Sequence, residues 1–155
     1  MNRRILLGLL ALAPAAALAQ DGPQPKLPME PLVIVTRDGK RHAFQVEMAI
    51  EPQQQMVGLM FRPVVAPDEG MLFDWGQPRE SSMWMRNTIA SLDMLFITQS
   101  GVILRIAERT VPHSLAPISS NGPVRATLEL AAGTAERLDI RVGDKVEQRI
   151  FGTAR

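Results

Sequence analysis

The chain has 155 residues, 17 Lys and Arg against 16 Asp and Glu, and neither cysteine nor tyrosine. The absence of cysteine excludes thiol redox chemistry, thiolate nucleophiles, disulfides and cysteine-ligated zinc. The near-neutral charge and an aromatic content of 5% argue against nucleic-acid binding, which needs a basic surface or rings on which bases stack.

The first 19 residues are typical of a secretory signal peptide. Asn2-Arg3-Arg4 supplies a charged start, residues 5–17 form an apolar run, and Ala17-Leu18-Ala19 is a small-x-small cleavage site. An uncleaved anchor is the alternative, but this run is shorter than the ~20 residues that a spanning helix needs. We therefore predict cleavage after Ala19 and a periplasmic or secreted product without a membrane span.

The predicted product is long enough for one ordinary domain. Loss of Arg3 and Arg4 leaves 15 basic and 16 acidic residues, a net charge of −1. Residues 20–31 contain four prolines, which indicates a flexible tether, so the single β-rich domain is expected over residues 32–152.

The first part of this domain reads as a hairpin followed by a helix. Strands are predicted at 32–36 and 43–50, and Asp38-Gly39 between them favours a tight turn. A short helix should follow Pro52, because Met56, Leu59 and Met60 recur at helical intervals.

The rest of the domain alternates short apolar segments with turn residues. Long loops are expected at 63–70 and 112–123, and a second short helix at 134–138. The remaining strands are expected at 71–75, 82–87, 92–98, 102–107, 124–130 and 145–150. About eight strands with one or two short helices predict a mainly β fold, a compact antiparallel β-sandwich or barrel that is jelly-roll-like.

Six motifs occur along the domain in a fixed order. They are Gln55–Arg62 (QMVGLMFR), Gly70–Phe73 (GMLF), Ser82–Thr88 (SMWMRNT), Leu92–Ile97 (LDMLFI), Leu128–Leu130 with Gly133, and Val142–Asp144 (VGD). Together they resemble the family called domain of unknown function 192, over roughly residues 32–151. The resemblance implies a compact β-rich domain in proteins that are often exported, and it implies no catalytic residues. Glu51 departs from the family, where a better helix-capping residue is common.

Methionine could supply a soft-metal site. On a strand, Met83 and Met85 would share one face, Met60, Met71 and Met94 lie in neighbouring motifs, and His113 could add a nitrogen ligand. Thioethers favour copper(I), so Met83, Met85, Met94 and His113 form the candidate metal set. The simpler interpretation is that these methionines are core fillers, and no cofactor is otherwise predicted.

Polar residues embedded in the apolar motifs form the second candidate site. They are Arg62, Asp68, Asn87, Thr88, Asp93 and Glu129, and His113 could join them. Buried polar groups must be paired, so structural pairing is one interpretation. A cleft in which Asp93 and Glu129 meet His113 is the other, and it would offer general acid-base groups for a hydrolase.

The preferred hypothesis is a non-enzymatic binding or accessory domain in the periplasm, acting on an unknown ligand or protein. Its candidate binding residues are Arg62, Asn87, Thr88, Asp93, His113 and Glu129. A copper(I) protein, a hydrolase that uses the carboxylates, and a purely interactional module are the alternatives.

Overall fold

A computed structural model describes residues 21–154, so the predicted signal peptide and its cleavage site lie outside the described residues. The elements in chain order are β1 (Met29–Val35), β2 (Arg41–Ala49), α1 (Pro52–Val57), β3 (Glu69–Met83), β4 (Leu92–Ile97), β5 (Ile103–Ala107), β6 (Ile118–Ala131), α2 (Thr134–Leu138) and β7 (Lys145–Glu147). A 3₁₀ turn follows at Arg149–Phe151. The expected mainly β fold with two short helices is confirmed. None of the helices in this range is both long and apolar enough to cross a membrane.

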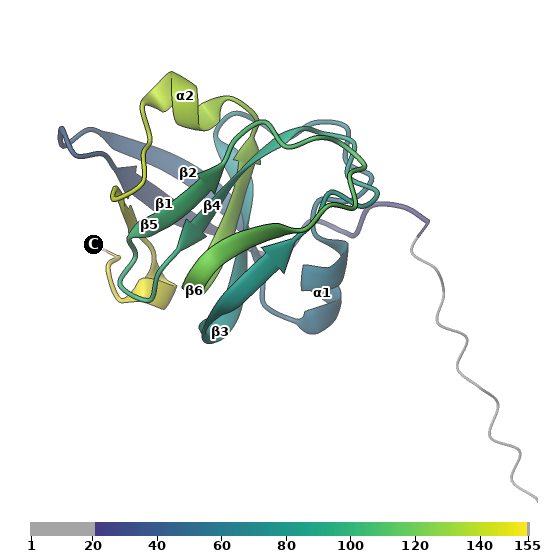
Figure 1. The fold of residues 1–155 in the computed structure, drawn as a ribbon, viewed down its shortest axis with the longest axis horizontal. Helices are drawn as coiled ribbons and strands as arrows, with labels where there is room; N and C mark the ends of the chain where they lie inside the picture. The colour runs from purple at the N-terminus through teal and green to yellow at the C-terminus, as the bar shows by residue number, and fades with distance from the viewer. Residues whose placement is uncertain (1–20, 155) are drawn as a thin grey trace, which may run out of the picture.

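The strands form one sheet in the order β5-β4-β6-β3-β2-β1-β7, which curls into a half-barrel (Figure 1). Its two edges meet, because Val102, just before β5, forms a bridge with Lys145 at the start of β7. The Val146 N–H also donates to the Gly101 carbonyl at 2.7 Å. Of the two architectures predicted from the sequence, a barrel therefore describes this fold better than a sandwich of two separate sheets.

One strand pair departs from the antiparallel pattern expected throughout. β2 and β3 run parallel, with Met48 opposite Leu72, whereas the other neighbouring strands are antiparallel. The reason is α1, because a helix in the connection returns the chain to the end from which it started. At the start of α1 the Gln54 side chain accepts hydrogen bonds from the backbone N–H groups of Ile50 and Glu51, both at 3.0 Å.

The sheet carries an apolar cluster on each face. The inner cluster fills the half-barrel and includes Leu72 of β3, Leu95 of β4 and Leu128 of β6. The outer cluster lies on the opposite face of the same three strands and includes Phe73, Met94 and Phe96. Alternation of side chains along β3, β4 and β6 thus buries both faces at the centre of the sheet.

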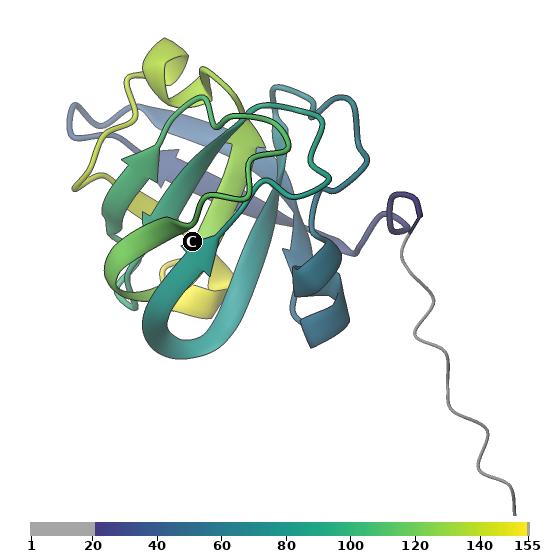
Figure 2. The same cartoon turned by 45° about the vertical axis from the view of Figure 1, so that its right-hand side comes forward.

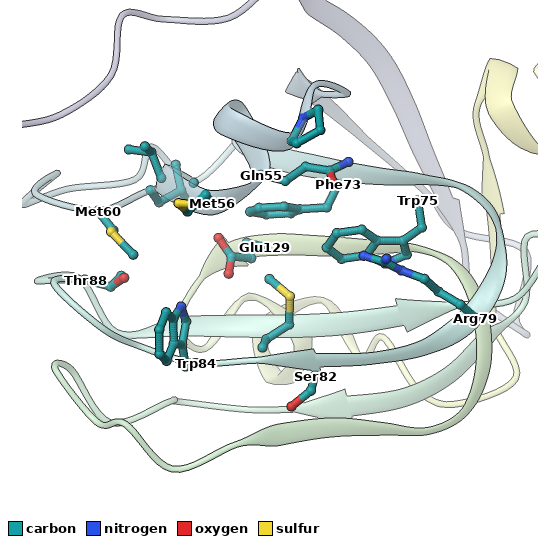
Figure 3. Close-up of a pocket in the computed structure, with 15 residues that line it drawn as sticks. Gln55, Met56, Met60, Phe73, Trp75, Arg79, Ser82, Trp84, Thr88 and Glu129 are labelled. Atoms are coloured by element: carbon teal, nitrogen blue, oxygen red, sulfur yellow. The ribbon is translucent and has the colours of Figure 1, made fainter. Parts of the chain in front are cut away.

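β3 and β6 form a long ribbon that bends back over the outer face. Their pairing shifts register between Asp74 and Arg79, and β3 turns there, so its second half crosses back past its first (Figures 2 and 3). Gly76 adopts φ +78° at the bend, a conformation that glycine takes without strain. This fold-back gives the outer cluster a second layer.

Several predicted strand boundaries differ from the structure, and residues 21–154 form seven strands rather than about eight, because the strand expected at 71–75 and the start of the strand expected at 82–87 are both parts of β3. The strand expected at 82–87 ends at Met83, and Asn87 adopts φ +53°, which no strand residue does. Conversely, β6 starts at Ile118, inside the predicted loop 112–123, because the ribbon extends to Ser119 opposite Ser82.

The described part of the Pro-rich segment 20–31, expected to be a flexible tether, contacts the domain. β1 already begins at Met29, and the Gln24 side chain donates to the carbonyls of Gln54 (3.0 Å) and Gly58 (2.9 Å) at the end of α1. Prolines suit this extended path because it needs few backbone donors.

Candidate functional site

A cavity of about 470 Å³ opens between α1, the bend of β3 and the segment that follows β3. Its wall is mostly apolar, with two tryptophans, one phenylalanine and three methionines. The lining residues are Pro52, Gln55, Met56, Val57, Gly58, Leu59, Met60, Phe73, Trp75, Arg79, Ser82, Met83, Trp84, Thr88 and Glu129. Figure 3 shows the Glu129 carboxylate between Phe73 and Met56 on one side and Trp84 on the other.

Glu129 is a buried carboxylate without a partner among the residues that the structure describes. It is 4% exposed, and its side chain has no hydrogen bond or ion pair within residues 21–154. Its cross-strand neighbours are Met71 on β3 and Met94 on β4, so thioethers flank it on both sides. Burial raises the pKa of Glu129 to about 8, because the charged form loses water and gains no compensating contact.

Trp75 is fixed on the β3 side of the cavity. Its indole Nε1 donates to Thr127 Oγ1 at 3.2 Å, and its ring stacks on Phe73 with 5.8 Å between centroids. The guanidinium of exposed Arg79 lies 4.4 Å from the Trp75 ring centroid. The hydrogen bond and the stacking together hold this aromatic wall in one orientation.

Gly58 lets α1 approach Phe73 closely. It ends the helix at φ +51°, and a Cβ at this position would lie 3.0 Å from the ζ carbon of Phe73. The Gln55 side chain fixes α1 from the other side, since it donates to the carbonyls of Ala49 (3.1 Å) and Asp74 (2.7 Å). Met56, by contrast, is 64% exposed at the edge of the cavity.

Trp84 belongs to the segment after β3 and is 44% exposed. The adjacent Met85 is fully buried, and its N–H donates to the Ser114 carbonyl at 3.0 Å, which anchors the segment. The Arg86 guanidinium lies 5.4 Å from the Trp84 ring centroid. Trp84 therefore forms a wall of the cavity that also faces solvent.

Asp93 has a structural role and does not line the cavity. It is fully buried, and its carboxylate accepts from three backbone N–H groups, those of Arg109 (2.9 Å), Gly133 (3.1 Å) and Ala135 (2.9 Å). These bonds join β4 to the start of α2 and to the segment after β5. The structure thus does not bring Asp93 together with Glu129.

Arg62 is likewise engaged away from the cavity. It forms a buried, two-pronged ion pair with Glu47, and Arg62 Nη2 lies 3.0 Å from Glu47 Oε2. The backbone N–H of Leu27 donates to the same carboxylate oxygen at 2.8 Å. This pair ties the loop after α1 to β2 and to the N-terminal segment.

Of the remaining candidates from the sequence, one lines the cavity and the others lie outside it. Thr88 lines the cavity, although its hydroxyl donates to the Arg86 carbonyl at 3.1 Å. Asn87 and Asp68 are not lining residues, and His113 is exposed on the loop after β5. Of the candidate binding residues, only Glu129 and Thr88 share the cavity.

The candidate metal residues lie in three different places in the fold. Met85 and Met94 are fully buried in the outer cluster, Met83 lines the cavity, and His113 lies apart from them on its exposed loop. Across residues 21–154, no group of three or more His, Asp and Glu side chains is placed to hold a metal ion.

The sequence candidates did not include the residues that give the cavity its shape. Trp75, Phe73 and Arg79 come from the bend of β3, and Met56 comes from α1. The alternation Phe73-Asp74-Trp75 places both rings on one face and could have indicated the aromatic wall. The bend that closes the wall depends on pairing between β3 and β6, and no local sequence motif indicates this pairing.

Comparison with known proteins gives a family and a fold. The model of the family DUF192, described as "Uncharacterized ACR", matches residues 33–148. No curated protein matches the chain significantly.

Two crystal structures are similar to this chain. One is a Sinorhizobium meliloti 1021 protein provisionally described as a transcription regulator, with a TM-score of 0.80, 46% identity, and coverage of 82% of this chain and 98% of that one. The other is a protein of unknown function from Novosphingobium aromaticivorans DSM 12444, with a TM-score of 0.77, 36% identity, and coverage of 89% and 99%. The chain therefore belongs to the DUF192 family.

Proposed function

We propose that this protein is a non-enzymatic, periplasmic binding domain that holds a small, largely apolar ligand in the cavity around Glu129. The observation that carries the proposal is an unpaired, 4% exposed carboxylate at an aromatic cavity of about 470 Å³. An isolated buried carboxylate costs stability, and a ligand group that satisfies it would explain why it is tolerated. The periplasmic location rests on the leader-like pattern of residues 1–19.

The size and lining of the cavity support small-molecule binding. Ligand sites are typically ~300–1,000 Å³, mostly apolar, and carry a few polar groups that orient the ligand. Here Glu129 and Arg79 are the ionisable lining residues, and the hydroxyls of Ser82 and Thr88 add polar contacts.

Binding is favoured over hydrolysis by what surrounds Glu129. A hydrolase of the kind considered from the sequence would place this carboxylate beside His113 or Arg62. Neither residue lines the cavity, and Arg62 is occupied by Glu47. A carboxylate with no histidine and no second carboxylate among the described residues of the cavity lining suits recognition better than general acid-base catalysis.

Transcription regulation, the provisional description of the relative from Sinorhizobium meliloti, would require a basic surface for DNA. Within residues 21–154, eight basic side chains form ion pairs with carboxylates, so that a negative charge lies next to each of these positive charges. Affinity for DNA depends on clustered Lys and Arg that neutralise phosphates. The proposal therefore assigns no nucleic-acid partner to this chain.

Tryptophan fluorescence can test the proposal directly, because both tryptophans of the chain line the cavity. The purified protein is titrated with a set of small aromatic and aliphatic compounds of different charge. We expect saturable changes in emission for a subset of them. Native mass spectrometry of protein isolated from its own cells then looks for a bound small molecule that is released on denaturation.

A matched pair of substitutions separates cavity binding from nonspecific quenching. Ser82→Phe places a ring at an exposed position that lines the cavity, whereas Gln99→Phe places the same ring in an exposed turn outside it. Binding should weaken at least tenfold in the first variant and stay unchanged in the second. Equal affinities in both variants, or no saturable binding by any compound, would contradict the proposal.

A copper(I) protein is the second candidate function, and one observation favours it. Three thioethers, those of Met56, Met60 and Met83, line the cavity. Soft thioether ligands select copper(I) over harder ions. Met85 and Met94, expected as ligands from the sequence, are core residues adjacent to this wall.

Titration of copper(I) against a competing chelator distinguishes this candidate. A copper protein should bind more tightly than micromolar and lose that affinity in the double variant Met60→Leu and Met83→Leu. The control is Met48→Leu, a buried methionine of the inner cluster. Weak binding, or binding that the double variant retains, excludes the copper function.

A further inference from the structure

Within residues 21–154, the two ionisable residues that line the cavity, Glu129 and Arg79, are of opposite type and lie in different surroundings. The carboxyl group of Glu129 is buried among apolar side chains, whereas Arg79, the other ionisable lining residue, is exposed beside Trp75. A ligand that carries a positive group toward Glu129 would supply the missing partner for that carboxylate. A second cation next to Arg79 would instead be repelled, so the positive group belongs at the Glu129 end.

The rings around Glu129 are suited to the same kind of group. The faces of Trp75 and Trp84 attract cations in this structure, since Arg79 and Arg86 lie 4.4 and 5.4 Å from their centroids. Aromatic side chains with a nearby carboxylate are the usual recognition surface for ammonium ligands. The apolar wall would contact the carbon groups attached to the nitrogen.

On the basis of the binding function proposed above, we propose that the ligand is an organic ammonium cation, with its charged nitrogen at Glu129 and its carbon groups against Phe73, Trp75 and Trp84. Glu129 acts as the counter-ion, and the rings add cation–π attraction. The cavity thus selects a cation by its charge and by its apolar envelope.

This assignment couples binding to proton release. In the empty cavity the pKa of Glu129 is about 8, so most molecules carry the neutral acid at pH 7. A bound cation requires the ionised form, and each binding event therefore releases most of one proton at pH 7. Apparent affinity should rise about tenfold between pH 7 and pH 9 and change little above that.

Glu129 alone should therefore account for the pH dependence of binding, because the charged groups on neighbouring elements are absent, paired or directed elsewhere. α1 contains no charged residue, and Asp93 of β4 points to the other face of the sheet. Asp74 of β3 pairs with Arg125 of β6.

A pair of isosteric probes tests the charge of the ligand. Choline and 3,3-dimethylbutan-1-ol have nearly the same shape, but only choline is a cation. Binding is followed by tryptophan fluorescence and calorimetry at pH 7, 8 and 9, and in two buffers of different ionisation enthalpy to count released protons. We expect choline to bind at least tenfold more tightly, with proton release and the tenfold rise toward pH 9.

Two substitutions complete the experiment. Glu129→Gln should abolish the preference for choline, its pH dependence and the proton release, whereas Glu136→Gln, an exposed carboxylate on α2, should retain all three. Circular dichroism confirms that both variants are folded.

The outcomes separate the two proposals. Equal binding of both probes overturns the cation assignment and leaves the binding function in place. The same holds if choline does not bind while other compounds do, provided that Ser82→Phe weakens the binding of those compounds. Failure of every compound in the wider set overturns both.

Discussion

Asp93 and Glu129 lie one register position apart on neighbouring strands, and their carboxylates point to opposite faces of the sheet. Asp93 is paired with Leu130, whereas Glu129 is paired with Met94. One carboxylate has three backbone donors, and the other has no partner within residues 21–154. Substitution of Asp93 should therefore lower stability through lost hydrogen bonds, whereas substitution of Glu129 should change how stability depends on pH.

Asp93→Ala should lower the free energy of unfolding by about 3 kcal/mol, because three buried N–H groups lose their acceptor. Urea unfolding followed by circular dichroism measures this loss. Asp93→Asn keeps one acceptor oxygen and should lose about half as much. Equal stability of Asp93→Ala and the unmodified protein would show that these bonds do not support the fold.

Glu129→Gln should change how stability depends on pH. The pKa of Glu129 rises from 4.5 to about 8 on folding, so the folded state binds more protons than the unfolded state between these values. Stability contributed by the neutral acid is thus complete below pH 4.5 and is lost progressively up to about pH 8. The loss should be on the order of 5 kcal/mol for the unmodified protein.

Urea unfolding of both proteins at pH 5 and pH 8.5 checks this prediction. The difference between the two pH values should be smaller in Glu129→Gln, which cannot ionise at this position. Parallel pH profiles for the two proteins would show that Glu129 ionises normally in the fold.

Gly58→Ala should destabilise the protein by about 2–3 kcal/mol. The new Cβ would lie 3.0 Å from Phe73, and the residue would be held at φ +51°. Gly39→Ala is the matched control, since Gly39 has φ +82° but nothing within 4 Å of its Cβ position. The control should lose only the backbone share, about 1 kcal/mol. Equal losses would mean that contact with Phe73 is unimportant.

Arg62→Ala should cost about 3–5 kcal/mol, because it leaves Glu47 charged and buried without its partner. The double variant Glu47→Gln with Arg62→Met should regain much of this loss, since no charge is then left unpaired. Thermal and urea unfolding measure both variants. A double variant as unstable as Arg62→Ala would show that packing, rather than charge, explains the loss.

Local sequence patterns were sufficient for most strands and for both helices. Pro52 with Met56 indicated α1, and Asp38-Gly39 indicated the first hairpin turn. The extension of β6 to Ile118 was missed, because Gly122 and Pro123 read locally as loop residues. Pairing with the bent half of β3 overrides that preference.

The candidate site was predicted in part for the same reason. Glu129 was detectable as a carboxylate within the apolar run Leu128–Leu130. The three partners of Asp93 lie 16 to 42 residues away in the sequence, so its structural role could not be read locally. Trp84 reaches the cavity around Glu129 only through the fold-back of β3, which a single sequence does not specify.

The bridge between Val102 and Lys145 also limits how this protein can meet other chains. Backbone groups at the outer strands that could recruit an additional strand are partly occupied within the molecule, as in the 2.9 Å bond from the Ile103 N–H to the Asp144 carbonyl. Strand addition and edge-to-edge aggregation both need such groups free. Pairing of a further strand with these two edges is therefore hindered by bonds within the molecule itself.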